Sequence, residues 1–110
     1  MRIEVLACAE AELVEAVEYY NQQLPGLGYE FAAEVKATFA RLAAFPEAWP
    51  AFSACSRRCL VNRFPYGVLY HLQGERILVL AIMHLRRDPR CWQERLSGTT
   101  GAPGAPSVAP

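Results

Sequence analysis

The chain has 110 residues, of which 53% are hydrophobic, and its 11 basic residues balance its 11 acidic residues to a formal net charge of zero. A chain of this length forms one compact domain, so a two-domain enzyme with its own cofactor-binding fold is excluded. The apolar content is sufficient for a buried core without a disulfide or a metal ion, and we expect no cofactor.

The N-terminal part of the chain predicts one strand followed by two helices. Residues 1–6 alternate between apolar and charged side chains, which is typical of a short strand. Apolar residues recur at helical spacing over residues 9–23, with glutamates on much of the remaining surface, which predicts an amphipathic helix. A Pro-Gly-Leu-Gly run at 25–28 interrupts the pattern, and helical spacing from Phe31 predicts a second helix that ends before Pro46. Two helices joined by so short a turn form a hairpin.

Three strands are predicted after the helices, because the apolar pattern there has a period of two. They cover residues 58–64, 66–72 and 76–84. Residues 77–83 are apolar at every position, which is typical of a central strand covered on both faces. The hairpin can cover only one face, so loops, the end of the chain or a partner must cover the other. The fold class is therefore α+β, with the order β-α-α-β-β-β and the helical hairpin packed on a small, mostly antiparallel sheet.

The ends and the cysteines of the chain set further expectations. Residues 97–110 (SGTTGAPGAPSVAP) have no packing pattern, which predicts a disordered Gly/Ala/Pro-rich tail after a domain spanning residues 1–96. The chain has no CxxC pair, no signal peptide and no apolar run long enough to cross a bilayer, so we expect a cytoplasmic protein with reduced thiols. A zinc site is not expected, because its cysteines would have a loose Cys-x3-Cys spacing. The residues of such a site would be Cys55, Cys59, His84 and Cys91.

The zero net charge conceals two halves of opposite sign. Residues 1–50 contain eight glutamates against three basic residues, whereas residues 51–110 contain eight arginines against three acidic residues. A basic half of this kind can bind a polyanion or an acidic partner, and pairing between the two halves is the alternative explanation.

Several short motifs follow one another in the order of the predicted elements. They are Glu15-Ala16-x2-Tyr19-Tyr20, Phe31-x2-Glu34-Val35, Pro46-x3-Pro50, Arg58-x-Leu60-x3-Phe64-Pro65-Tyr66 and Ile77-x-Val79-x-Ala81-x2-His84-x-Arg86-Arg87-x-Pro89-x2-Trp92. Over residues 1–96 the chain resembles the RelE/ParE superfamily, the toxins of bacterial type II toxin–antitoxin systems. The resemblance implies a small toxin that is neutralised by an antitoxin whose C-terminal segment wraps around it. RelE-like members cut messenger RNA on the ribosome, whereas ParE-like members inhibit DNA gyrase.

RNA cleavage would need catalytic groups that are largely missing here. Attack by a 2′-hydroxyl requires a base, positive charge for the developing phosphorane and an acid for the leaving oxygen. The resemblance places a family arginine at Arg86, but the only lysine is Lys36, and Trp92 stands where the family's C-terminal tyrosine would fall. His84 can titrate near neutrality and shares a face with Arg86 on an extended strand, so these two residues are the candidate catalytic pair of an endoribonuclease. A hydrogen bond that closes the strand is the structural alternative for His84.

Partner binding is the other use of the basic residues. Arginine binds carboxylates and phosphates bidentately, so an arginine cluster suits an acidic antitoxin segment, ribosomal RNA or gyrase-bound DNA equally well. The candidate partner-binding residues are Arg57, Arg58, Arg63, Tyr66, Arg86, Arg87, Arg90 and Trp92. We favour a ParE-like toxin that inhibits DNA gyrase by binding. A RelE-like, ribosome-dependent mRNA endoribonuclease is the alternative, and an inactive or decayed interaction module is the third hypothesis.

Overall fold

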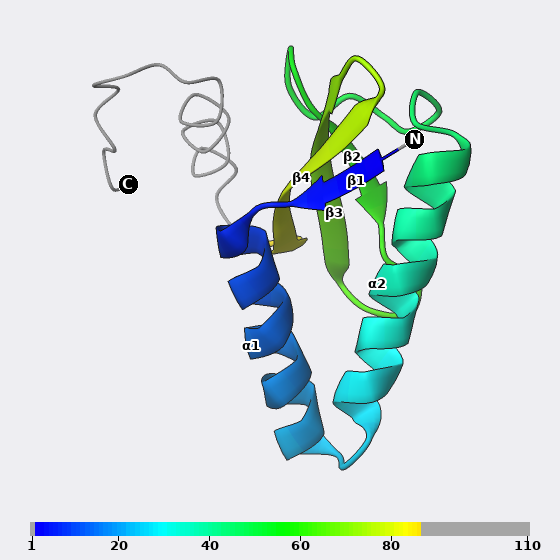
Figure 1. Ribbon diagram of the computed structural model, residues 1–110. Coiled ribbons are helices and arrows are strands. Elements are labelled where there is room, and N and C mark those ends of the chain that lie inside the picture. Colours follow the sequence, from blue (N-terminus) through cyan, green and yellow to red (C-terminus); the bar gives the residue numbers. More distant parts are fainter. Residues whose placement is uncertain (1, 87–110) are drawn as a thin grey trace.

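The computed structural model describes residues 2–86, and these form the elements in the predicted order (Figure 1). The elements are β1 (Arg2–Val5), α1 (Ala7–Gln23), α2 (Leu27–Ala44), β2 (Arg57–Leu60), β3 (Tyr66–Gln73) and β4 (Arg76–His84). This order confirms the predicted α+β class. Neither helix in this part of the chain is long and apolar enough to cross a membrane. The predicted tail at residues 97–110 lies outside the described residues.

The four strands form one mixed sheet in the order β1-β4-β3-β2. β1 pairs in parallel with β4, whereas β4 with β3 and β3 with β2 are antiparallel, which confirms the mostly antiparallel prediction. Every residue of β4 from Ile77 to Met83 is at most 3% exposed. The continuous apolar run therefore marks a central strand, because only a strand covered on both faces has no polar side.

α1 and α2 form a hairpin that covers one face of the sheet (Figure 1). Phe31, Val35 and Leu42 of α2 are buried in the main core with sheet residues that include Val68 and Val79. Burying such side chains is the main favourable term in folding, at roughly 25 cal/mol per Å² of apolar surface. The hairpin thus supplies the core on which the position of the strands depends.

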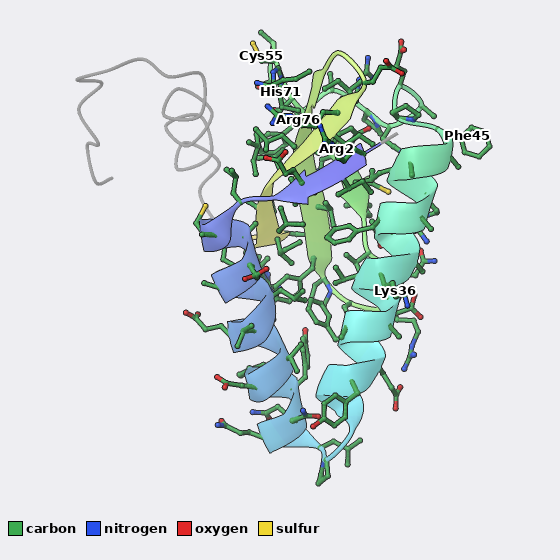
Figure 2. The ribbon with its side chains drawn as sticks, viewed as in Figure 1. Arg2, Lys36, Phe45, Cys55, His71 and Arg76 are labelled. Carbon is green, nitrogen blue, oxygen red and sulfur yellow. The ribbon has the colours of Figure 1, made fainter. Side chains whose placement is uncertain are left out.

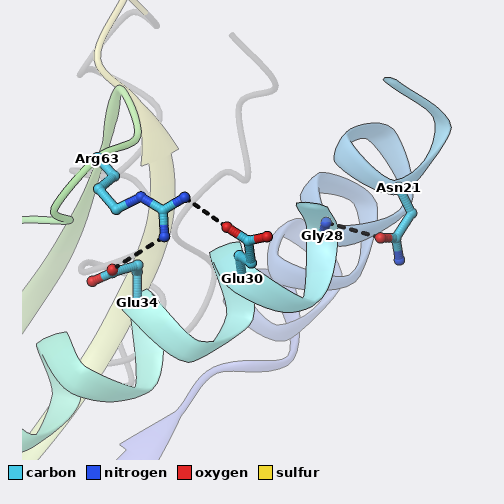
Figure 3. A network of polar contacts seen from close by, with 5 residues as sticks. All are labelled: Asn21, Gly28, Glu30, Glu34 and Arg63. Atoms are coloured by element: carbon cyan, nitrogen blue, oxygen red, sulfur yellow. Dashed lines mark hydrogen bonds and ion pairs between the residues drawn. The ribbon is translucent and has the colours of Figure 1, made fainter. Parts of the chain in front are cut away.

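The turn between the helices is held by one side chain and two glycines. Asn21 Oδ1 accepts hydrogen bonds from the backbone N–H of Gly26, at 3.1 Å, and of Gly28, at 2.8 Å. Figure 3 shows the bond from Gly28. Gly26 has a φ of 91°, a left-handed conformation that favours glycine. A Cβ at Gly28 would collide with the backbone oxygen of Val17, so α2 approaches α1 more closely here than any other residue allows.

The face of the sheet opposite the hairpin is also buried. A second apolar cluster on this face comprises Leu69, Leu78, Leu80, Ala81 and Met83, each at most 3% exposed. Among the described residues, Leu6 and Phe52 pack against this cluster. Phe52 belongs to the loop between α2 and β2, so this loop covers part of the face opposite the hairpin. A loop was one of the three covers that the sequence analysis considered.

The loop between α2 and β2 is fixed to the sheet by polar contacts as well. The hydroxyl of Tyr70, a fully buried residue of β3, donates to the Pro46 carbonyl at 2.6 Å. Arg57 of β2 donates from Nη1 to the Trp49 carbonyl at 2.8 Å. Burial raises the pKa of Tyr70 to about 12, and the charge of Arg57 opposes this rise. The neutral phenol is therefore the form that the folded protein holds.

The strand predicted over residues 58–64 is wrong at its C-terminal end, because β2 stops at Leu60. Arg63 has a φ of 72°, a left-handed conformation that interrupts extended pairing. Its guanidinium forms ion pairs with Glu30 at 2.6 Å and Glu34 at 3.7 Å on α2 (Figure 3). Both helices also begin earlier than predicted, at residues 7 and 27. Because α2 begins earlier, the turn between the helices is shorter than predicted.

We predict that Gly28→Ala destabilises the protein by about 1–3 kcal/mol, because the added methyl overpacks the helix contact at Val17. The same change at an open helical position stabilises a protein by up to about 1 kcal/mol, so the sign of the effect is diagnostic. Urea unfolding followed by circular dichroism measures the change. A stabilised Gly28→Ala variant would contradict the close approach of the two helices.

The raised pKa of Tyr70 predicts a loss of stability at high pH. Between about pH 10 and pH 12 the unfolded chain releases the phenolic proton while the folded protein retains it, so the free energy of unfolding falls over this window. Tyr70→Phe is expected to be less stable at pH 8, because it loses the bond to Pro46, and to lose less stability above pH 10. Equal pH slopes in the two proteins would contradict this account.

Candidate functional site

One edge of β4 is paired with β1 in its first half and with side chains of α1 in its second half. The pairing of β1 with β4 ends at Val79, although β4 continues to His84. Beyond this point the Cys8 thiol donates to the Leu80 carbonyl, with a sulfur–oxygen distance of 3.8 Å. The Ile82 N–H donates to Glu12 Oε1 at 3.1 Å. Because Cys8 and Glu12 are four residues apart, successive turns of α1 reach successive backbone groups of β4.

A small pocket of about 200 Å³ lies where this edge ends. Glu12 and Glu15 of α1 line it together with Tyr19, Tyr66 and His84. Two carboxylates in so small a pocket favour a cationic or hydrogen-bond-donating group and disfavour a phosphate. We call this the β4-end pocket.

His84 closes β4 within this pocket. Its Nδ1 accepts the backbone N–H of Arg86 at 3.2 Å, and its ring packs edge-on against Tyr66 with 5.2 Å between ring centroids. This is the strand-closing hydrogen bond that the sequence left open as the alternative to catalysis. Arg86 is exposed and contributes its backbone to this contact.

A larger groove of about 480 Å³ lies along β2, the edge strand at the other side of the sheet. We call it the β2 groove; the lining residues that matter here are Arg41, Trp49, Phe52, Arg58 and Leu60. Arg41 Nη2 donates to the Leu60 carbonyl and to Thr38 Oγ1, each at 3.0 Å. Burial raises the pKa of the Cys59 thiol beside it, and the hydrogen bond and charge of Arg41 lower it. The groove thus combines two cations with apolar surface.

The predicted arginine cluster does not form among the described residues. Arg57 and Arg58 are neighbours on β2 and so point to opposite faces of the sheet. Arg58 lies over the Phe52 ring, with its guanidinium carbon 5.2 Å from the ring centroid. Arg63 faces α2 and is held by glutamates, and Arg86 lies after the end of β4. The predicted residues Arg87, Arg90 and Trp92 lie outside the described residues.

Tyr66, the aromatic residue of the predicted surface, belongs to a packed group of rings. Its ring centroid lies 4.9 Å from that of Phe31 and 6.1 Å from that of Tyr20. Burial raises the pKa of Tyr20, and the nearby Tyr66 and Tyr19 add to this rise. Tyr66 therefore supports the core and lines the β4-end pocket at the same time.

Sequence reasoning missed Glu12 and Arg41. Both occupy helical positions whose charge is typical of a solvated face, and each instead binds a strand backbone group. The sequence offered one signal for Glu12. The strand predicted over residues 1–6 is shorter than the strand predicted over residues 76–84, so it cannot pair with the whole length of that strand. The helix that follows the short strand is then the nearest source of side chains.

The edge closure makes a prediction for Glu12. Glu12→Leu leaves the Ile82 N–H without its acceptor and is expected to cost about 1–3 kcal/mol of unfolding free energy. Glu12→Gln keeps an acceptor oxygen at the same place and is expected to cost less than half as much. Urea unfolding gives both values, and hydrogen exchange of the Ile82 amide should accelerate in the leucine variant only. Equal stabilities of the two variants would contradict the closure.

Comparison with known proteins places this fold in a family. The family model described as "ParE toxin of type II toxin-antitoxin system, parDE" matches residues 3–89. None of the curated proteins matches the chain significantly. A solved structure titled "Chromosomal ParDE TA system from P. aeruginosa" is similar to it, with a TM-score of 0.64, 15% sequence identity, and coverage of 78% of this chain and 97% of that chain. The structural likeness confirms the fold, and the family match spans most of the sequence, so this chain belongs to the ParE toxin family of type II toxin–antitoxin systems.

Proposed function

We propose that this protein is a toxin that arrests growth by binding DNA gyrase and that a cognate antitoxin neutralises it. Membership of the ParE family supports the toxin role and an antitoxin partner. Such a target would place the action of the protein in the cytoplasm. The choice between binding and RNA cleavage rests on the chemistry around His84.

The observation that carries the choice is the acidic character of the β4-end pocket. A phosphorane gains negative charge in the transition state, so a ribonuclease surrounds it with cations. The pocket that His84 lines instead contains the carboxylates of Glu12 and Glu15. A carboxylate can serve as the base of such a reaction, but the described residues that line this pocket include no lysine or arginine to stabilise the negative charge of the transition state, which favours binding over RNA cleavage at His84.

The distribution of cations supports the same choice. The single lysine of the sequence, Lys36, projects from α2 and is exposed, on a helix and not on the middle strands (Figure 2). Arg86, the family arginine, contacts His84 through its backbone. Inhibition by binding requires none of these groups to exchange protons with a substrate.

Induced expression of His84→Ala in bacteria tests the proposal. Loss of a general acid or base slows an enzyme by about 10²- to 10⁴-fold, whereas growth arrest by binding is expected to change by less than about twofold. His71→Ala, at the other histidine of the chain, is the matched control. Circular dichroism and urea unfolding of both purified variants verify that they fold.

Two readouts in the same cells identify the target. We expect DNA breaks that depend on gyrase and intact transcripts on ribosomes. Cleaved transcripts that disappear with His84→Ala would establish the endoribonuclease instead. Absence of growth arrest at high expression would show that the protein is an inactive interaction module.

A further inference from the structure

The β2 groove brings together two arginines that come from different elements. Arg41 belongs to α2 and Arg58 to β2, and both line the same cavity of about 480 Å³. The described residues that line this cavity include no aspartate or glutamate. Within the described part of the chain, Arg63 and Arg76 form ion pairs with glutamates, whereas Arg41 and Arg58 form none. The groove therefore carries positive charge that no ion pair of residues 2–86 neutralises.

The two guanidinium groups are held in different ways. Arg41 is fixed by its hydrogen bonds to the Leu60 carbonyl and Thr38 Oγ1, which are neutral acceptors and leave its charge in place. Arg58 stacks on the Phe52 ring and donates no side-chain hydrogen bond to another described residue. A guanidinium that is positioned without a carboxylate presents N–H donors in the geometry that binds an oxyanion bidentately. The groove is thus suited to an anion.

Apolar surface forms much of the remaining wall. Leu60 is 52% exposed although it is apolar and lies in a strand. Trp49 and Phe52, from the loop before β2, line the groove as well. The Pro50 carbonyl accepts the Arg58 N–H at 3.1 Å, so the loop that forms this wall is already tied to β2 in the free protein. The cavity volume lies in the range of small-molecule sites, which is about 300–1,000 Å³.

We propose that the β2 groove binds a small organic phosphate monoester, with the phosphate at Arg41 and Arg58 and the organic part against Leu60 and the loop. Charge selects the phosphate, because a monoester carries about −1.5 to −2 charges at pH 7 and matches two guanidinium groups better than a singly charged carboxylate does. The apolar wall selects an ester over inorganic phosphate, since burial of a ring or chain adds favourable free energy. The inference names a ligand and does not depend on the toxin role.

A pair of matched small molecules tests the site. The probe is phenyl phosphate, titrated into the full-length protein labelled with ¹⁵N. Its control is phenyl sulfate, which has nearly the same shape and a single negative charge. We expect amide shifts concentrated at residues 49–52 and 58–62, with phenyl sulfate and inorganic phosphate each about fivefold weaker or worse. Equal affinities for phenyl phosphate and phenyl sulfate, shifts centred outside these residues, or no shift at millimolar probe would overturn the proposal.

Substitutions separate the charged from the apolar contact. Arg58→Gln is expected to weaken phenyl phosphate about tenfold or more, and Arg58→Lys to lose less, because lysine keeps the charge without the fork of donors. Leu60→Ser is expected to weaken phenyl phosphate about threefold and to leave inorganic phosphate unchanged. Arg2→Gln on β1 is the control and should bind as the wild type does (Figure 2). Urea unfolding verifies that each variant folds, and unchanged affinity in folded Arg58→Gln would contradict the site.

Two larger probes distinguish the sources of a phosphate monoester. Adenosine 5′-monophosphate represents a free nucleotide, and capped phosphotyrosine represents a phosphorylated protein side chain. We expect at least one of them to displace phenyl phosphate, and the tighter of the two identifies the source. Failure of both to displace it would show that the groove takes an adventitious anion only, which would overturn the proposal.

Discussion

The structure depends on one strand, β4, whose residues are apolar on both faces and whose backbone must be hydrogen-bonded on both edges. A buried peptide group without a partner costs about as much as a lost hydrogen bond, so neither edge can be left open. β3 closes one edge, and β1 followed by Cys8 and Glu12 of α1 closes the other. The hairpin covers one face, and Leu6 and Phe52 pack on the opposite one. β2 closes the remaining edge of β3, and residues 50–52 pair with part of the outer side of β2.

The central strand and the hairpin could be predicted because their signals are local. Seven consecutive apolar residues define β4, and helical spacing defines α1 and α2. The C-terminal end of β2 could not be predicted from local signals. It depends on Arg63, which adopts a left-handed conformation where it pairs with Glu30 and Glu34 of α2, a helix distant in sequence. The placement of Arg57, Arg58 and Arg63 could not be predicted for the same reason, because alternation along β2 and pairing with distant glutamates separate arginines that are close in sequence.

The two charged halves of the sequence are partly paired with each other. The ion pairs of the described residues join glutamates of the first half, Glu4, Glu30 and Glu34, to arginines of the second, Arg63 and Arg76. These pairs are exposed or half-buried at the surface and each contributes about 0–1 kcal/mol, so their main effect is to neutralise surface charge. Arg58 is different, because its guanidinium rests on the aromatic ring of Phe52. Among the described residues, no carboxylate forms an ion pair with Arg58.

A protein that inhibits by binding inactivates at most a fixed number of target molecules per toxin molecule, whereas an enzyme turns over many substrate molecules. The central proposal is that this ParE-family protein is of the first kind, since His84 closes β4 in a pocket whose described lining includes no lysine or arginine. Titration of purified protein against DNA supercoiling by gyrase tests this claim most directly. We expect inhibition that saturates at a fixed ratio of toxin to gyrase and that the antitoxin reverses. Unchanged supercoiling, together with multiple-turnover cleavage of ribosome-bound messenger RNA, would contradict the claim.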